Sequence, residues 1–359
     1  MHSGKQKHIM VAVLDWGLGH ATRCIPIINC LLTNGCKVSI AGNGSSLELL
    51  KQEFPQLTFY ELASYKVTYP LSGFFFLHLL FQSPRIFRAI CTERRQIEKL
   101  VSENNIDAII SDNRYGCYSG KVPSVLITHQ LNIQLPASLT WSKPMVDFTN
   151  NRLIKKFNTC WIPDFPSGFT GKLSQTKKVN GRLIGMLSRF QLNDIVQESD
   201  LVVGLVSGPE PQREFFEKLL IKEFKKLNKP CLIVRGLPNV MQNETQDGNI
   251  TLRAHAPVQE LQSIISKAGF IISRSGYTTI MDLQAIGKKH VIFIPTPGQT
   301  EQEYLAKELE KRKIAYAQRQ NQFNLKEAIQ RSKEYNGFEA SLHRTNLLSE
   351  AVHDLLHQI

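Results

Sequence analysis

The chain has 359 residues, of which 42% are hydrophobic and 21% charged, a composition typical of a folded globular protein rather than a disordered one. This length is sufficient for two domains, each with its own core. The seven cysteines are scattered without a Cys-x-x-Cys pair, so we expect neither a zinc site nor a disulfide framework, and a cytoplasmic location. The formal net charge of +12 favours anionic partners such as nucleotides or acidic lipid.

Apolar segments near the N-terminus bear on membrane association. The first 15 residues contain no apolar segment of signal-peptide length, so we expect no export. The longest apolar run, residues 71–81, is much shorter than the roughly 20 residues of a spanning helix. Because arginines follow this run, it predicts either a helix that rests on acidic lipid at the inner membrane face, or a buried helix or lid over a cleft.

Strand-like and helix-like runs alternate along the chain. Strands are expected at 9–15, 37–42, 107–111 and 123–128, with helices at 24–35 and 45–54. A segment rich in Pro, Gly, Lys and Ser, 161–190, interrupts the alternation and predicts a domain junction. The alternation then resumes from residue 200 to residue 296, which predicts two doubly wound α/β units in tandem. A final helix places Leu348, Val352, Leu355 and Ile359 on one face, as expected of a helix packed across a domain joint or of any surface helix.

The loop after the first strand contains two glycines and a histidine, Gly17, Gly19 and His20. Glycines let the backbone approach a ligand closely, and the amides at the next helix start suit an anion. An imidazole at this edge of a sheet can act as a general base or bind an anion, and Asp15 and Arg23 flank it in the sequence. A solvated or helix-capping histidine is the alternative interpretation.

Two later loops also join a strand end to a helix start. Ser207 and Gly208 precede a helix with Arg213 about one turn in, so a phosphate there would meet amides and a guanidinium; ordinary turn chemistry is the alternative. Residues 274–279 read RSGYTT and present amides and hydroxyls at a positive helix end. Asp282 follows, where a carboxylate can accept hydrogen bonds from a ribose diol or simply favour the helix dipole.

With these loops, the chain resembles the glycosyltransferases of family 28, which includes the bacterial enzyme that adds N-acetylglucosamine to lipid-linked muramyl peptide. The resemblance is carried by ISRSGYTTIMDLQAIGKKHVIFIPTPGQTEQEYLA and, more weakly, by GLGHATR, SDNRYG and THQLN. It implies the GT-B fold, an α/β architecture of two facing Rossmann-like domains with a C-terminal helix that crosses back. The implied division is an acceptor-binding domain at 1–165, a linker region at 166–197, a nucleotide-sugar-binding domain at 198–340 and the helix at 341–359.

The resemblance also implies a role for individual residues. Donor-binding residues are expected at Ser207, Gly208, Arg213, His255, Ala256, Val258, Arg274, Ser275, Gly276, Tyr277, Thr278, Asp282, Glu301 and Gln302. Acceptor-binding residues are expected at Gly17, Gly19, Arg23 and His129, and the candidate catalytic bases are His20, Asp15 and Asp112, in that order. The family usually has a glutamate at the position of Asp282 and a glutamine at that of Glu301, so the second difference suggests another sugar preference.

The implied reaction moves a hexose or N-acetylhexosamine from a nucleotide sugar, expected to be UDP-linked, to a glycan, lipid-linked or small-molecule acceptor with inversion. Helix amides and Arg274 would stabilise the departing diphosphate, and since no Asp-x-Asp pair occurs, we expect neither a metal nor a cofactor. Two alternatives remain: a nucleotide-sugar hydrolase or 2-epimerase, and a non-catalytic nucleotide-sugar-binding partner protein. Nucleic-acid binding is not expected, because the lysines are dispersed.

Overall fold

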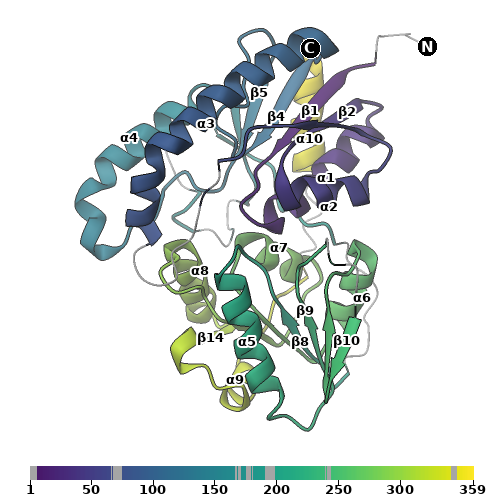
Figure 1. Cartoon of the computed structure of the whole chain (residues 1–359), viewed down its shortest axis with the longest axis vertical. Helices are drawn as coiled ribbons and strands as arrows, with labels where there is room; N and C mark the ends of the chain where they lie inside the picture. Colours follow the sequence, from purple (N-terminus) through teal and green to yellow (C-terminus); the bar gives the residue numbers. More distant parts are fainter. Residues whose placement is uncertain are drawn as a thin grey trace.

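The computed structural model describes residues 6–359, apart from 66, 68–74, 166–167, 169–170, 175–178, 180, 191–198, 239, 241–243 and 341–345. The chain forms two lobes, each built on a seven-stranded sheet with helices on both faces (Figure 1). This arrangement confirms the α/β class and the two doubly wound units predicted from the alternating pattern.

The first sheet is parallel throughout, in the order β3-β2-β1-β4-β5-β6-β7. Its strands are β1 His8–Val13, β2 Lys37–Gly42, β3 Thr58–Glu61, β4 Ala108–Asp112, β5 Ser124–Ile127, β6 Thr159–Ile162 and β7 Gly181–Leu183. Its helices are α1 Leu18–Thr33, α2 Gly44–Glu53, α3 Phe75–Asn104, the 3-10 helix η1 Ala137–Ser142 and α4 Lys143–Ile154. All six residues of β1 are buried, because helices cover both faces of this central strand and favour an unbroken apolar run.

The second sheet has the order β10-β11-β9-β8-β12-β13-β14, and only the β10–β11 pair is antiparallel. Its strands are β8 Val202–Leu205, β9 Cys231–Val234, β10 Glu244–Asp247, β11 Ile250–Arg253, β12 Phe270–Ser273, β13 Val291–Phe293 and β14 Tyr316–Ala317. Its helices are α5 Gln212–Phe224, α6 Val258–Lys267, α7 Tyr277–Ala285, α8 Thr300–Lys311, η2 Gln320–Gln322 and α9 Leu325–Ser332. The apolar residues on the two faces of this sheet form separate core clusters.

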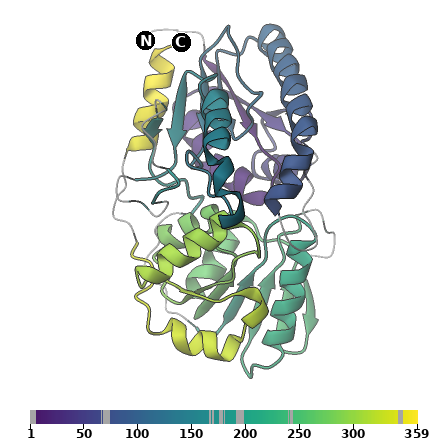
Figure 2. The ribbon, with the colours of Figure 1, turned by 90° about the vertical axis from the view of Figure 1, so that its left-hand side faces the viewer.

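The last helix, α10 Leu347–His357, returns to the first lobe (Figures 1 and 2). Ala351, Val352 and Leu355 are buried in the core cluster that also contains the apolar face of α1. Arg182, in β7, forms an ion pair with Asp354 of the same helix. The predicted crossing back of the C-terminal helix is therefore confirmed.

The change of sheet occurs later in the chain than the composition suggested. The pairing of β7 with β6 extends the first sheet to Leu183, inside the segment 166–197 that was expected to be linker. The second sheet begins with β8 at Val202. A strand of three residues rich in Gly and Arg carries little periodicity, so the sequence pattern did not separate it from a loop.

The apolar run 71–81 coincides with the start of α3. Residues 71–74 and the side chains of 75–80 lie outside the described residues, so the two interpretations of this run remain predictions. From Phe81 onward the helix is described, and Phe81 itself is 85% exposed. In the described part of the chain, no helix combines the length and the apolar character of a membrane span.

Candidate functional site

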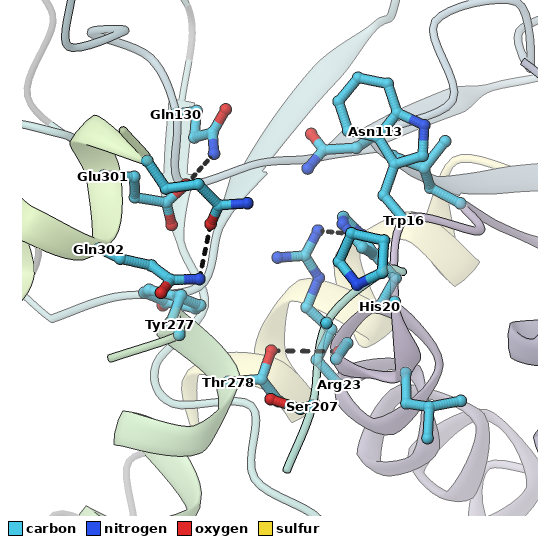
Figure 3. Close-up of a pocket in the computed structure, with 18 of the residues that line it drawn as sticks. Trp16, His20, Arg23, Asn113, Gln130, Ser207, Tyr277, Thr278, Glu301 and Gln302 are labelled. Atoms are coloured by element: carbon cyan, nitrogen blue, oxygen red, sulfur yellow. Dashed lines mark hydrogen bonds between the residues drawn. The ribbon is translucent and has the colours of Figure 1, made fainter. Parts of the chain in front are cut away.

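A cavity of about 940 Å³ lies between the two lobes. Its walls include the loop after β1, the loops after β8 and β12 and the start of α8, together with parts of α3 and α4. Because the strands of each sheet run parallel, the loops that follow them gather at one edge, and the two edges face each other across this cavity. Figure 3 shows residues of both lobes around this space.

His20, on the first turn of α1, is held by a buried acid. Its Nδ1 lies 2.7 Å from Oδ2 of Asp112, which ends β4 and has no exposed surface. Residues Val13 and Asp112 are paired in register, so the loop after β1 lies directly over the end of β4. Two groups approach this nitrogen, the Asp112 carboxylate at 2.7 Å and Nη2 of Arg23 at 2.9 Å. We assign the ring proton to Nδ1, because the carboxylate is the closer of the two and only accepts, and this leaves the lone pair on Nε2.

Burial lowers the pKa of His20 below its ordinary value of 6.5, because the charged ring would lose its hydration. The Arg23 guanidinium, with Nη2 at 2.9 Å from Nδ1, lowers the pKa further, whereas Asp112 opposes the shift. The imidazole is therefore neutral at pH 7 and able to accept a proton. This is the protonation state that a general base requires.

Arg23 occupies the next turn of α1 and contacts the side chains of His20, Asp112 and His129. Its Nε donates to Asp112 Oδ1 at 2.7 Å, and its Nη1 lies 3.3 Å from Nδ1 of His129, which follows β5. The His129 ring stacks on Tyr277 of the second lobe, with centroids 3.9 Å apart and an angle of 6° between the planes. The structure thus brings the predicted acceptor-side residues Arg23 and His129 next to a predicted donor-side residue.

Glu301, on the first turn of α8, faces the first lobe. Its Oε1 lies 2.7 Å from Nε2 of His129, and its Oε2 accepts from the Gln130 amide (Figure 3). Burial would raise the pKa of Glu301, but His129 and other neighbours outweigh it, so the pKa is lowered and the group is an anion at neutral pH. Gln302 lines the same wall, where its Oε1 accepts from the Thr296 amide at 2.8 Å.

The glycine loops of the two lobes are adjacent. Gly17 and Gly208 have φ values of 103° and 104°, which favour glycine, and a side chain on Gly17 would meet the Gly208 backbone at 3.9 Å. Thr278 donates from its hydroxyl to the Gly19 carbonyl at 3.1 Å (Figure 3). Ser207, Gly208, Gly276, Tyr277, Thr278 and Thr279 all line the cavity, together with His255 and Ala256.

Asp282 also lines the cavity, but it is not the solvated helix residue considered above. Ser188 donates to its Oδ1 at 2.7 Å, and Arg189 donates to its Oδ2 at 3.2 Å. Only 5% of Asp282 is exposed, and this burial raises its pKa, partly offset by Arg189. Replacing Asp282 would therefore disturb Arg189, which is itself part of the cavity wall.

Two predicted charged residues, Asp15 and Arg213, do not reach the cavity wall. Asp15 accepts from the Ser46 amide at 3.1 Å and so caps the first turn of α2. Arg213 forms ion pairs with Glu210 and Glu217, both at 2.5 Å. The order of residues along a loop does not determine which way a side chain turns, and each of these finds its partner beside the sheet edge.

Arg274 likewise turns away from the cavity. Its Nη1 donates to the Ile294 carbonyl at 2.9 Å, and burial lowers its pKa to about 9. Ser275 is fully buried and donates to the Gln302 carbonyl at 2.8 Å, which supports the loop from behind. Val258 packs against the core clusters of both lobes. None of these three side chains is part of the cavity wall, so their contact with the donor stays a prediction.

Two parts of the wall were missed from the sequence. Trp16 lies at the tip of the first loop, and its buried indole nitrogen has no partner among the described residues. An apolar wall is formed by one face of α3 and one face of α4: Pro84, Ile86, Phe87, Ile90, Met145, Val146 and Leu153. The apolar spacing of these helices was the available signal, but it does not distinguish a cavity from a core.

Metal ligands are not clustered in the described ranges, where no group of three or more His, Cys, Asp or Glu side chains could hold an ion.

Comparison with known proteins relates this geometry to a family. Residues 215–358 match the family 28 glycosyltransferase C-terminal domain. A protein of Methanosarcina acetivorans described as an uncharacterized glycosyltransferase is 24% identical over 330 residues, which cover 82% of this chain and 81% of the relative. These matches confirm the resemblance to family 28 and support glycosyl transfer.

Solved structures agree on the architecture. The glycotransferase of kitacinnamycin superposes with a TM-score of 0.63 at 14% identity, over 99% of this chain and 96% of its own. Acinetobacter baumannii MurG superposes with a TM-score of 0.59 at 15% identity, and the match covers 98% of this chain and 100% of MurG. LpCGTa in complex with UDP superposes with a TM-score of 0.57 at 13% identity, and the match covers 99% of this chain and 94% of LpCGTa. At these identities the similarity shows the fold, which is GT-B.

Proposed function

From a GT-B fold whose second lobe matches the family 28 glycosyltransferase domain, we propose that the chain is an inverting transferase. It moves a hexose or N-acetylhexosamine from a UDP-sugar to a hydroxyl of an acceptor bound by the first lobe. The observation that carries this proposal is the neutral His20, held by Asp112 on the side of the cavity that faces the helix starts of the second lobe.

In the proposed mechanism, Nε2 of His20 takes the proton of the acceptor hydroxyl as its oxygen attacks the anomeric carbon. The bond between that carbon and the diphosphate oxygen breaks on the opposite face, so the configuration inverts. Asp112 stabilises the imidazolium that forms, because its carboxylate already accepts the Nδ1 proton. The departing diphosphate gains negative charge, which the amides at the start of α7 and the loop at Ser207 and Gly208 stabilise. We propose that this stabilisation needs no metal ion.

Arg189 adds a cation to the donor end of the cavity. Its side chain is 13% exposed and is fixed by Asp282, so it presents donors in a set direction. His255 and Ala256 lie on the same wall, where the resemblance implies the nucleobase. We therefore extend the donor site to Arg189 and assign Asp282 the task of orienting it, in place of direct ribose binding alone.

UDP is expected to raise the melting temperature, because it binds the folded chain and not the unfolded one. At about 100 times the Kd this stabilisation amounts to about 2.7 kcal/mol. Arg189→Met should weaken UDP binding roughly 10-fold or more, as the loss of a charge-assisted hydrogen bond predicts, and isothermal titration calorimetry measures it. Chelator should leave both results unchanged.

Two further variants sharpen this test. Arg189→Met alone leaves the buried Asp282 carboxylate without its ion-pair partner. Combining it with Asp282→Asn removes both charges, so the double variant shows the loss of the Arg189 contact with UDP without the effect of an unpaired buried acid. Arg253→Met is the matched control, since Arg253 pairs with Glu244 and Glu260 outside the cavity wall. A melting temperature that does not change with UDP, with UDP-sugars or with other nucleoside diphosphates would contradict the proposal.

The acceptor is proposed to carry an apolar part. The wall of α3 and α4 is apolar, and it continues into side chains on the surface of the same helices and of η1. These exposed residues are Phe81, Phe87, Trp141, Met145 and Phe148. Exposed arginines of α3, Arg85 and Arg88, lie beside them in the sequence. An apolar face flanked by cations suits a membrane of acidic lipid, so we propose a lipid-linked acceptor taken up at the inner face of the membrane.

Sedimentation with vesicles tests this face. The chain should bind vesicles that contain phosphatidylserine, and Trp141→Ser with Phe148→Ser should reduce binding roughly 10-fold or more, because each large apolar side chain contributes about 1.5–3 kcal/mol when buried. Neither residue lines the cavity, so turnover of a water-soluble acceptor should persist. Phe215→Ser is the control, since Phe215 is an exposed apolar residue of the other lobe. Equal binding by all variants would exclude this surface.

A further inference from the structure

A line of hydrogen bonds crosses the cavity from one lobe to the other. It begins at Arg23, whose Nη1 lies 3.3 Å from Nδ1 of His129. It continues from Nε2 of His129 to Oε1 of Glu301, over 2.7 Å. Arg23 is also bonded to Asp112, which holds His20. The proposed base in the first lobe is thus connected, through Asp112, Arg23 and His129, to the first turn of a helix in the second lobe.

Each hydrogen bond in this line has a fixed donor and a fixed acceptor. A guanidinium only donates, so Nδ1 of His129 must accept from Arg23. The other ring nitrogen then carries the proton and donates to Glu301, which is an anion. The His129 side chain is 4% exposed, so this bond is largely shielded from water. Arg23 therefore fixes the tautomer with which His129 holds the opposite lobe.

Neighbouring contacts keep the two lobes together at the same place. The Tyr277 ring stacks on His129, and Gln130 donates to the second oxygen of Glu301. Next to Glu301, Thr300 donates from its hydroxyl to the Gln134 carbonyl at 2.8 Å. Both oxygens of Glu301 thus accept from the first lobe, which is more than a residue devoted to sugar binding would require.

We propose that Glu301 and His129 are an interlobe pair that positions the reaction. By holding the start of α8 against the loop after β5, the pair sets the distance between His20 and the anomeric carbon of the donor. This inference rests on the proposed function for its kinetic consequence, whereas the contact between the lobes stands independently of it. Glu301 and His129 act through the position of other groups, and neither takes a proton in the reaction.

A double-mutant cycle tests the pair. Glu301→Ala and His129→Ala should each lower kcat roughly 10-fold or more, the effect expected of losing a hydrogen bond to a charged group. The double variant should lose no more than either single variant, because the two share one interaction. His129→Gln should recover most of the activity, since its amide nitrogen can donate to Glu301. Glu308→Ala is the control, because Glu308 is an acid of the same helix that pairs with Arg312, the residue just after the end of that helix.

Small-angle X-ray scattering of the unliganded chain gives a readout that needs no turnover. The two single variants should be more extended than the wild type, and Glu308→Ala should not. If no nucleotide sugar is turned over but the variants still open, the proposed function fails and the pair stands. Unchanged scattering together with additive losses of kcat would overturn the pair. So would a raised KM for the donor in Glu301→Ala alone with kcat intact, because that pattern assigns Glu301 to sugar binding.

Discussion

His20→Ala is expected to lower kcat roughly 100-fold or more while the Kd for UDP stays close to that of the wild type. The imidazole is lost from the first lobe, whereas most of the proposed donor site belongs to the second. For the wild type, kcat/KM should fall as the pH drops through the pKa of His20, because protonation removes the base. Since burial and Arg23 lower that pKa, the fall should begin below pH 6.5, and the variant should lose this acidic limb.

Initial rates measured from pH 4.5 to 9, with a saturating UDP-sugar and varied acceptor, give kcat and the kcat/KM for the acceptor. His353→Ala is the matched control, because His353 is an exposed histidine of α10, remote from the cavity wall. Wild-type turnover in His20→Ala would remove the base from the mechanism. Release of free sugar at an equal rate with and without acceptor would instead favour the hydrolase alternative.

Asp112→Ala is expected to reduce both stability and turnover. The carboxylate has no exposed surface, and it is the ion-pair partner of Arg23, of which 2% is exposed. Removing it leaves a buried guanidinium unpaired, which costs about 3–5 kcal/mol of the free energy of unfolding. The same change releases His20 from its orienting bond, so kcat should fall as far as it does in His20→Ala.

Urea denaturation measures the first effect and single-turnover rates measure the second. Asp15→Ala is the informative comparison, since both acids were candidate bases in the sequence. Because Asp15 caps α2, its loss should cost only about 1 kcal/mol and leave kcat unchanged. If Asp15→Ala abolished turnover while Asp112→Ala retained it, the assignment of the buried acid would be reversed.

The fold was predictable because the same sequence pattern, an apolar strand followed by a helix, recurs along both halves of the chain. Buried parallel strands such as β1 and β8 have nearly continuous apolar sequences, and helices of regular period separate them. The edge strand β7 was not predictable, because three residues provide no period and each pairs with a residue 21 positions earlier. The return of α10 was predictable from its apolar face together with the family resemblance.

The site was predictable where the backbone decides the position. Gly17, Gly208 and Gly276 follow strand ends, and parallel topology alone brings those ends to one edge. Side-chain direction is a different matter. Arg274 and Arg213 belong to the expected loops, yet each satisfies its charge or donors behind the cavity wall. Arg189 lies between the two sheets in the sequence, where no motif marks it, and only the fold brings it to Asp282.

The return of α10 to the first lobe determines how these two domains can be exchanged or separated. The first lobe is not one continuous segment: its core needs Ala351, Val352 and Leu355 from the end of the chain. The second lobe, by contrast, is an insert that leaves the first after Leu187, the last residue of the first core cluster before the second sheet, and rejoins it before Leu347. A chimera with a new donor specificity should therefore replace the insert and retain both flanks. A truncation after β7 would strip an apolar surface from the lobe that remains, and we expect such a fragment to aggregate.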